Sequence, residues 1–259
     1  MKIEKFGQGE PRFNIIVGIH GNETAPVKGF ILLKKYIEDK NIKKAFCVII
    51  TNEKAFKANK RFIKVDLNRC FPGNPKGCYE ERLANQLMVE TSKAEFNFDF
   101  HSTSTSIDKP YGIVSIYNKK VHKIMAATGI KNYIFDSNES LIKFATNSLA
   151  FEVGCERDHR SPDNAFMIMK NILINFNAIN EKIKFKHYLP NIYLIYHFIP
   201  RSKFLSLNDK LIDFEYVEKG ETIGRLKNKK LLIASEGFYP ISVKDKIAIK
   251  KAKRITIKE

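Results

Sequence analysis

The sequence contains only four cysteines, and no two of them form a CxxC pair. A cysteine-based zinc site and a disulfide framework are therefore not indicated, and we expect reduced thiols. No apolar run approaches the roughly 20 residues that a membrane-spanning helix needs. The first residues, MKIEKFGQGEPRFN, also lack the apolar stretch of a secretory signal. These absences predict a cytoplasmic protein without a membrane partner.

Acidic residues are scarce relative to basic ones, because 28 Asp and Glu against 45 Lys and Arg give a formal net charge of +17. Such a charge can attract nucleic acid, an anionic surface or small anionic substrates. The lysines are, however, spread along the whole chain and interleaved with acids, and no module rich in arginine and aromatic residues is present. We interpret most of them as solvated faces that help to attract anions, and we expect no nucleic-acid partner.

The 259 residues, of which 44% are hydrophobic, suffice for one large domain or for one domain plus a smaller appendage. Strand-like apolar runs alternate with helical patterns through the first two thirds of the chain. The expected strands lie at 13–20, 44–52, 96–105, 111–118 and 148–154, and the expected helices at 25–40, 79–95 and 161–182. Thr24 and Ser161 are candidate N-caps. This alternation predicts an α/β fold with a mixed, largely parallel sheet flanked by helices.

The alternation of strand-like and helix-like segments ends at about residue 185. Short β-rich runs separated by turns follow, at 191–199, 211–217, 221–226, 230–235 and 247–252. We therefore expect two domains, a catalytic α/β domain at 1–184 and a small β-rich domain at 185–259 that covers the active site.

Polar clusters stand where four of the expected strands end. His20 and Glu23 follow FNIIVGI, and the loop from Arg61 to Arg69 comes after KAFCVIITN. His101 follows FNFDF, and Glu152 lies late in SLAFEVG. Ligands of open α/β sheets bind beyond the carboxyl ends of the strands, so these clusters are the candidate functional site.

The residue types in these clusters indicate a catalytic metal. An HxxE spacing such as that of His20 and Glu23 often arises by chance, but His101 adds a third ligand. Two imidazoles and one carboxylate form the open ligand set of a catalytic zinc, which leaves a position for water. Asp99 lies on the same strand face as His101 and either orients it or forms an ordinary strand-end salt bridge.

Hydrolysis also needs a proton carrier and a binding site for the substrate. Glu152 at the end of an apolar strand would have a raised pKa, which suits a general base, although a surface glutamate is the alternative. Arg69 and Asn68 can hold a carboxylate. Arg61 can support the oxyanion that develops at the scissile carbonyl.

Together these motifs resemble the aspartoacylase and succinylglutamate desuccinylase family within the zinc carboxypeptidase fold. The matching segments are GIHGNE, RFIKVDLNRCFPG, DFHSTS and FEVG, with IASEGFYPI as a C-terminal tyrosine segment. The resemblance implies one zinc ion per chain held by His20, Glu23 and His101, with Glu152 as general base and then acid. It also implies that Arg61 polarises the carbonyl, that Asn68 and Arg69 hold the substrate carboxylate, and that Tyr239 reaches in from the β domain. The implied reaction is hydrolysis of a small anionic N-acyl amino acid.

The chain departs from the family pattern near the catalytic glutamate. Ile142 stands where aspartoacylases carry the arginine that grips the side-chain carboxylate, and Asn138 replaces a nearby tyrosine. Lys143 could substitute as a point charge, without bidentate geometry. Specificity for N-acetylaspartate is therefore not expected.

The remaining histidines are weaker candidates. His122 is expected on a helix surface, and His187 and His197 are expected to be packing or edge residues. His159 follows the catalytic strand and could line the pocket.

Two other functions fit the same sequence. One keeps the zinc chemistry but acts on a peptide, a deacetylated sugar or a polyamine conjugate. The other is a non-catalytic basic protein that binds nucleic acid and carries a structural zinc. A structural zinc would be closed by four protein ligands and would need neither Glu152 nor Arg61. The sequence leaves a homo-oligomer open.

Overall fold

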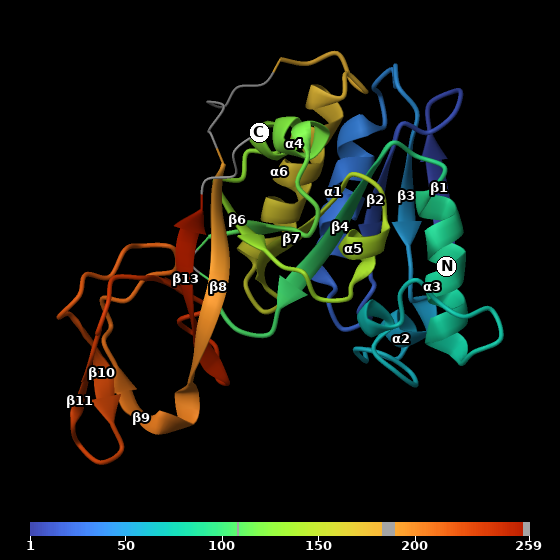
Figure 1. The fold of residues 1–259 in the computed structure, drawn as a ribbon. Helices are drawn as coiled ribbons and strands as arrows, with labels where there is room; N and C mark the ends of the chain where they lie inside the picture. The colour runs from blue at the N-terminus through green and yellow to red at the C-terminus, as the bar shows by residue number, and fades with distance from the viewer. Residues whose placement is uncertain (108, 183–189, 256–259) are drawn as a thin grey trace.

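The computed structural model describes residues 1–107, 109–182 and 190–255. Its main feature is a ten-stranded sheet with the order β1-β3-β2-β4-β7-β5-β6-β8-β13-β12 (Figure 1). The bounds of these strands are β1 Lys2–Phe6, β2 Phe13–Val17, β3 Phe46–Ile50, β4 Phe96–Thr103, β5 Tyr111–Val114, β6 Asn132–Phe135, β7 Ser148–Cys155, β8 Asn191–Pro200, β12 Tyr239–Ile241 and β13 Ala248–Ile255. Pairing is parallel from β3 through β2 and β4 to β7, and again from β5 through β6 to β8. The predicted mixed, largely parallel sheet is confirmed.

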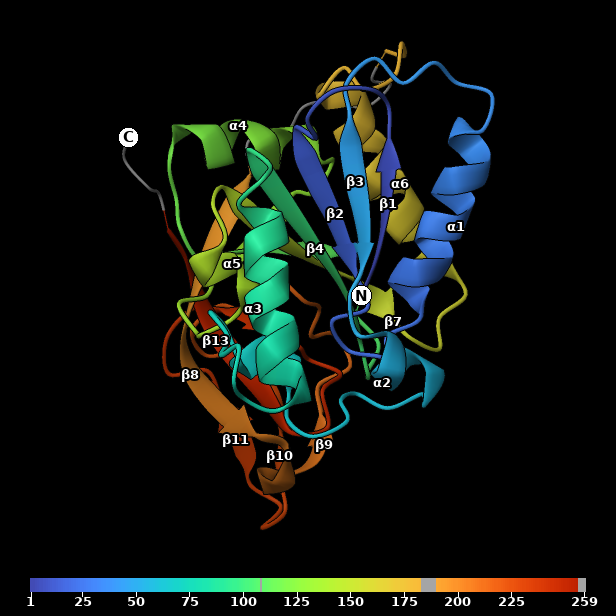
Figure 2. The same ribbon diagram turned by 90° about the vertical axis from the view of Figure 1, so that its right-hand side faces the viewer.

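Helices cover both faces of this sheet (Figure 2). The helices are α1 Ala25–Ile37, α2 Glu53–Lys57, α3 Tyr79–Thr91, α4 Lys119–Ala127, α5 Leu141–Phe144 and α6 Arg160–Asn175, with 3-10 turns η1 Leu67–Arg69 and η2 Arg201–Lys203. One core cluster joins the sheet to α1, α4 and α6, and a second joins it to α3 and α5. The central strands are therefore buried on both sides, as their continuous apolar sequences predict.

Aromatic rings fill the centre of the larger core. The ring of Phe13 stacks on Phe46 at 5.2 Å and meets Phe98 edge-on at 6.1 Å, both measured between ring centroids. Phe176, which follows α6, contacts Phe13 and Phe98 at 4.8 and 5.7 Å. These contacts anchor β2, β3 and β4 against the last helix, so the loops at their carboxyl ends start from fixed positions.

Of the two predicted helix caps, Thr24 is the N-cap residue of α1 without a capping side-chain hydrogen bond, and Ser161 is not a cap. Thr24 does precede α1, but its hydroxyl donates to the Glu156 carboxylate, which also accepts a hydrogen bond from the Ala25 amide at 3.0 Å. Ser161 lies inside α6, where it donates to the Cys155 carbonyl at 2.7 Å. At that helix start the Asp158 carboxylate accepts from the Arg160 amide at 2.9 Å. Carboxylates from neighbouring segments thus replace the hydroxyl caps that local sequence suggested.

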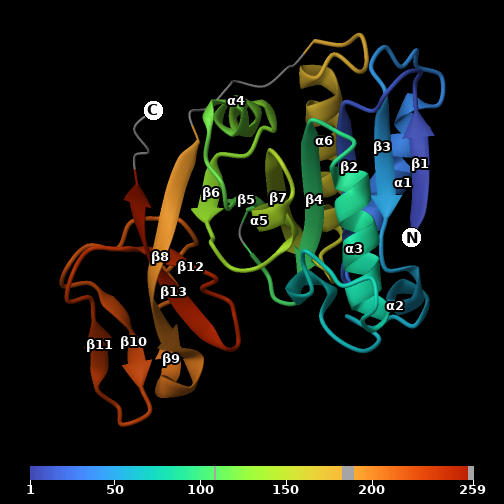
Figure 3. The ribbon, with the colours of Figure 1, turned by 45° about the vertical axis from the view of Figure 1, so that its right-hand side comes forward.

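The C-terminal part contributes to two sheets. β8, β13 and β12 extend the large sheet, whereas β9 (Phe204–Leu207), β10 (Thr222–Leu226) and β11 (Leu231–Ile233) form a separate antiparallel sheet. Figure 3 shows this small sheet at the end of the molecule far from β1. The expected small β unit is confirmed, while the predicted domain boundary between 184 and 185 lies outside the described residues.

One predicted strand that is absent and four strands that were not predicted mark the limits of the pattern. Residues 211–217 form no strand beyond a single bridge between Val217 and Phe238. Phe214 adopts a φ of 65°, which breaks an extended run. Conversely, β1, β6, β9 and β12 were not predicted from the sequence. No helix of the described chain has the length and apolarity required to cross a membrane.

Candidate metal centre and active site

The four predicted clusters meet at one edge of the large sheet. β2 and β7 flank β4, and His101 on β4 lies opposite Glu152 on β7 in the strand register. His20 and Glu23 occupy the turn between β2 and α1. A cavity of about 690 Å³ opens at this edge, and its lining includes all four of these residues. The residues that the carboxyl-end rule predicted to lie together therefore line one cavity.

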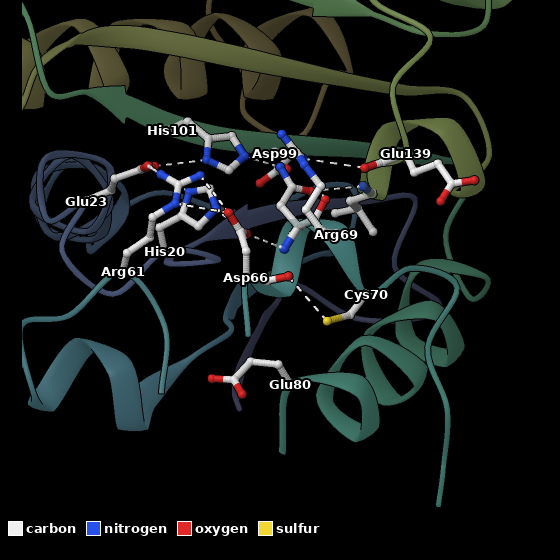
Figure 4. Close-up of polar contacts among 12 residues, drawn as sticks. His20, Glu23, Arg61, Asp66, Arg69, Cys70, Glu80, Asp99, His101 and Glu139 are labelled. Atoms are coloured by element: carbon white, nitrogen blue, oxygen red, sulfur yellow. Dashed lines mark hydrogen bonds and ion pairs between the residues drawn. The ribbon is translucent and has the colours of Figure 1, made fainter. Parts of the chain in front are cut away.

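Three donor groups in this cavity form a compact set. Ligand atoms of His20, Glu23 and His101 lie within 4.8 Å of one another, and all three residues are buried. Nδ1 of His20 is 2.7 Å from Oε1 of Glu23, and Nδ1 of His101 is 2.9 Å from Oε2 of the same carboxylate (Figure 4). The two rings thus present the same nitrogen toward a shared acidic centre.

The outer nitrogens of both rings are held by carboxylates. Nε2 of His20 is 3.0 Å from Oδ1 of Asp66, and Nε2 of His101 is 2.8 Å from Oδ2 of Asp99. Metal-binding histidines are typically oriented by such a carboxylate on the nitrogen that does not bind the metal. The donor set and its supports fit a divalent ion of the zinc type, with Nδ1 of each ring as the ligand atom.

Asp66 was missed by the sequence analysis, although it lies in the VDLNR segment that was singled out. Its carboxylate also accepts from the Asn68 amide at 2.9 Å and from Nε of Arg61 at 3.1 Å. One aspartate therefore ties together an imidazole, an arginine and the start of η1. Its position within that segment could have identified it as a candidate. Its contact with His20, 46 residues away in the sequence, could not be predicted without the fold.

Charge governs the protonation of the cluster. Burial alone would raise the pKa of Glu23, but the charges and hydrogen bonds of His101 and His20 outweigh it and lower that pKa to about 2. Burial likewise disfavours the charged form of His101, yet Asp99 and Glu23 raise the pKa of this imidazole well above its usual value. The centre is thus a strongly acidic environment that stabilises positive charge between the two rings.

Glu152 has the opposite electrostatic character. Burial raises its pKa to about 7, with His101, His20 and Lys250 opposing the rise and Glu23 adding to it. Its Oε2 is shielded from solvent and has no hydrogen-bond partner among the described residues. A carboxyl group with this pKa can accept a proton and return it near neutral pH.

The predicted arginine and asparagine positions also line the cavity. Arg61 donates from Nη1 to Oε1 of Glu23 at 3.2 Å and, through Nε, to Asp66. Asn68 Oδ1 accepts from the Leu141 amide at 3.1 Å, which leaves its NH₂ group to donate. Arg69 donates from Nη1 to the Asn68 carbonyl at 2.9 Å and to the Glu139 carbonyl at 3.5 Å (Figure 4). These contacts hold both arginines at the mouth of the cavity.

The C-terminal segment reaches the cavity with other residues than the sequence suggested. Tyr239 is not among the lining residues, and its ring packs against Tyr193 and Tyr216 at 5.1 and 5.0 Å. Ser242, Asp245 and Lys250 line the cavity instead. The role assigned to Tyr239 stays a prediction, and the C-terminal contribution comes from the chain that follows it.

The weaker histidine candidates lie away from this cavity. The side chain of His159 is 92% exposed beside Asp158, and the ring of His122 lies 5.5 Å from that of Tyr117. His197 is exposed on β8, opposite Lys251. His187 falls outside the described residues. None of the three described ones lines the cavity.

Comparison with known proteins identifies the family. A family model described as the succinylglutamate desuccinylase/aspartoacylase catalytic domain matches residues 10–160. The chain belongs to this family. It is 31% identical over 121 residues to a probable aspartoacylase of Acaryochloris marina, a match that covers 42% of this chain and 40% of that protein. A probable aspartoacylase of Prochlorococcus marinus is 27% identical over 234 residues, covering 81% of this chain and 72% of that protein.

Solved structures of this family share the fold. The crystal structure of a succinylglutamate desuccinylase/aspartoacylase from Rhodobacter sphaeroides superimposes with a TM-score of 0.74 at 15% identity, covering 98% of this chain and 89% of that one. The architecture of the succinylglutamate desuccinylase/aspartoacylase family is therefore present over nearly the whole chain.

The positions that depart from the family pattern differ in where they lie. Ile142 on α5 is 3% exposed and lines the cavity, as does Asn138. Lys143 is outside the lining and pairs with Glu139 at 3.7 Å. Lys143 is therefore not placed to substitute for an arginine in the cavity.

Proposed function

We propose that this protein is a zinc-dependent amidohydrolase that cleaves the acyl amide bond of a small anionic N-acyl amino acid. The observation that carries the proposal is the pairing of His101 with Glu152 across β4 and β7. It sets a three-donor centre beside a carboxyl group whose pKa is about 7. An open ligand set next to a proton carrier is what metal-assisted hydrolysis requires.

His20, Glu23 and His101 would hold the zinc ion. When bound, the ion polarises a carbonyl and lowers the pKa of water toward about 7. Asp66 and Asp99 fix the ring orientations, so that Nδ1 of each histidine faces the shared centre.

The chain's own residues divide the remaining tasks. Glu152 accepts the proton of the attacking water and donates it to the leaving amine. Arg61 stabilises the charge that develops on the carbonyl oxygen. Asn68 and Arg69, named here the carboxylate clamp, bind the carboxylate of the substrate.

The C-terminal part has a supporting role in this proposal. We keep the division into a catalytic part (1–184) and a β-rich part that covers the active site (185–259). Ser242, Asp245 and Lys250 support it, because they bring the C-terminal segment to the cavity. Limited proteolysis tests the division, since the first cleavage is expected near residue 184, whereas first cleavage within residues 1–184 would contradict it.

The test is a panel of N-acetyl and N-succinyl amino acids, assayed with zinc-loaded and chelator-stripped protein. We expect turnover that is lost on stripping and restored by zinc. Glu152→Gln should retain zinc while its turnover falls by about 10²–10⁴-fold. Glu10→Gln, on an exposed residue, serves as the control. Full activity in stripped protein or in Glu152→Gln would refute the mechanism.

The main alternative, a basic protein with a structural zinc, makes different predictions. It requires a fourth protein ligand, whereas the donor group of the described chain has three members. It also requires tight binding of duplex DNA with a steep salt dependence. Binding of this kind, together with no turnover of any N-acyl amino acid, would favour that alternative.

A further inference from the structure

The floor of the cavity becomes apolar on the side of Glu152 away from β2. Ala150 lies two residues before Glu152 on β7, so both side chains face the same side of the sheet. In the register Ala150 lies opposite Ile113 of β5, and Ile113 lies opposite Ile134 of β6. The row that begins at Asp99 beside the metal ligands therefore continues as alanine, isoleucine and isoleucine.

Two further isoleucines complete this surface. Ile195 of β8 and Ile142 of α5 line the same cavity. Ile134 and Ile142 are 4% and 3% exposed, whereas Ile113 and Ile195 are half-buried and accessible from the cavity. We call Ile113, Ile134, Ile142 and Ile195 the isoleucine wall.

The isoleucine wall lies next to the carboxylate clamp. The amide of Leu141, the residue before Ile142, donates to Asn68 Oδ1, so α5 is tied directly to the clamp. In an amino acid the carboxylate and the side chain leave the same carbon atom. A substrate whose carboxylate is bound by the clamp would therefore direct its side chain onto this wall.

Two aspartates of the cavity lining disfavour a second carboxylate on the substrate. Asp136, which lies two residues after Ile134, and Asp245 both line the cavity, whose cationic lining residues are Lys250, Arg61, Arg69 and Arg157. Both aspartates accept local backbone hydrogen bonds, from the amides of Asn138 and Ile247. Two fixed carboxylates would repel a dianionic substrate, because like charges in a partly desolvated cavity interact strongly.

We propose, resting on the function proposed above, that the substrate is the N-acyl derivative of a neutral amino acid with an aliphatic side chain, which the isoleucine wall binds. The side chain gains from leaving water for an apolar surface. A carboxylate in the same place would lose its hydration in a cavity that also holds the carboxylates of Asp136 and Asp245.

The first test compares kcat/KM for N-acetyl-leucine, N-acetyl-aspartate and N-acetyl-lysine with the zinc-loaded protein. We expect N-acetyl-leucine to be preferred over both others by at least about tenfold, the scale of discrimination by apolar contacts. Ile113→Thr and Ile195→Thr should each lower kcat/KM for N-acetyl-leucine about tenfold. Ile116→Thr, on a residue that is 49% exposed and outside the cavity lining, is the matched control.

Other outcomes would overturn the proposal in distinct ways. A preference for N-acetyl-aspartate that disappears in Lys250→Met would assign Lys250 as the reader of a second carboxylate. A preference for N-acetyl-lysine that is lost in Asp136→Asn would assign the aspartates to a cationic side chain.

A binding measurement separates this proposal from the proposed reaction. Calorimetry with Glu152→Gln protein measures the affinity for the same three compounds without turnover. Tighter binding of N-acetyl-leucine, weakened by Ile113→Thr, would support the isoleucine wall even if the wild-type protein hydrolysed none of them. Equal affinities for all three would refute the wall, whatever the activity.

Discussion

Asp66→Asn tests whether the orientation of the candidate metal centre depends on one aspartate. Asp66 contacts Nε2 of His20 at 3.0 Å and Nη2 of Arg61 at 3.0 Å. Burial raises the pKa of Asp66, but His20 and Arg61 outweigh it and hold this pKa well below its usual range, so the carboxylate is charged at neutral pH. The amide keeps the shape and can still accept from the Asn68 amide, while the negative charge is lost.

The magnitude follows from these contacts. Loss of the carboxylate behind a metal-binding histidine costs about 10–100-fold in metal affinity, which corresponds to about 1.4–2.7 kcal/mol. Asp99→Asn should lower metal affinity by a similar factor, because Asp99 supports His101 as Asp66 supports His20. Among the residues of the site, Asp99 contacts His101 and not Arg61. Asp66→Asn should in addition lower kcat, since Arg61 loses the charge of one of its two carboxylate partners, Asp66 and Glu23.

Zinc affinity is measured by competition with a chelator of known affinity, and kcat is measured at saturating zinc. Asp39→Asn, on an exposed residue at the end of α1, is the control. Zinc affinity in Asp66→Asn within twofold of the wild-type value would refute the orienting role. A kcat equal to that of Asp99→Asn would refute the additional role through Arg61.

Three other changes probe the clamp, the core and the surface. Arg69→Ala should raise KM for carboxylate-bearing substrates about 10–100-fold with little change in kcat, as for loss of a charged hydrogen bond; an unchanged KM in steady-state assays would remove Arg69 from the clamp. Phe98→Ala should lower the free energy of unfolding by about 3–5 kcal/mol in urea titrations, because this ring is 0% exposed among aromatic neighbours; a loss below about 1 kcal/mol would contradict that packing. Hydrogen bonds from Lys40 and Tyr36 lower the pKa of Glu181 below 4.5. The ionised carboxylate therefore contributes about 0.2–1 kcal/mol to the free energy of unfolding above pH 4.5, and this contribution is lost as the pH falls through the lowered pKa. Glu181→Gln should therefore reduce stability at pH 7 but not at pH values far below 4.5, and an equal loss at both would contradict the linkage.

Most of the fold and much of the candidate site could be predicted because local patterns carried them. The apolar runs around Phe13, Phe46 and Phe98 are continuous, as strands buried on both faces must be. Four polar clusters at strand ends then needed only the rule that parallel strands end at one edge. The same reasoning failed at residues 211–217, where the β-rich run folds irregularly around Phe214 and Asp213 accepts from the Val243 amide at 2.8 Å.

The parts that could not be predicted depend on contacts across the chain. The hydrogen bond between Asp66 and His20 joins two loops, and the sequence of neither loop predicts that it contacts the other. The C-terminal residues that line the cavity are set by the pairing of β13 with β8 and β12. This pairing places Lys250 opposite Phe198 and Ile241, and Lys250 lines the cavity whereas Tyr239 does not. The rule that ligands bind at the carboxyl ends of parallel strands does not apply to antiparallel strands at the edge of a sheet. A sequence motif near such strands therefore does not determine which side chain lines the cavity.

Strand order explains why so few residues are enough for the proposed chemistry. β2, β4 and β7 are consecutive in the sheet, so His20, His101 and Glu152 come from three neighbouring strand ends. His101 and Glu152 lie directly opposite each other in the strand register. The His101 ring contacts two carboxylates, whereas Oε2 of Glu152 is shielded from solvent and has no hydrogen-bond partner among the described residues. The carboxyl ends of these strands thus hold a carboxylate whose pKa is about 2, Glu23 in the turn after β2, and another whose pKa is about 7, Glu152 on β7. Two carboxylates with pKa values driven apart in this way can take different roles, one holding a cation and the other moving a proton.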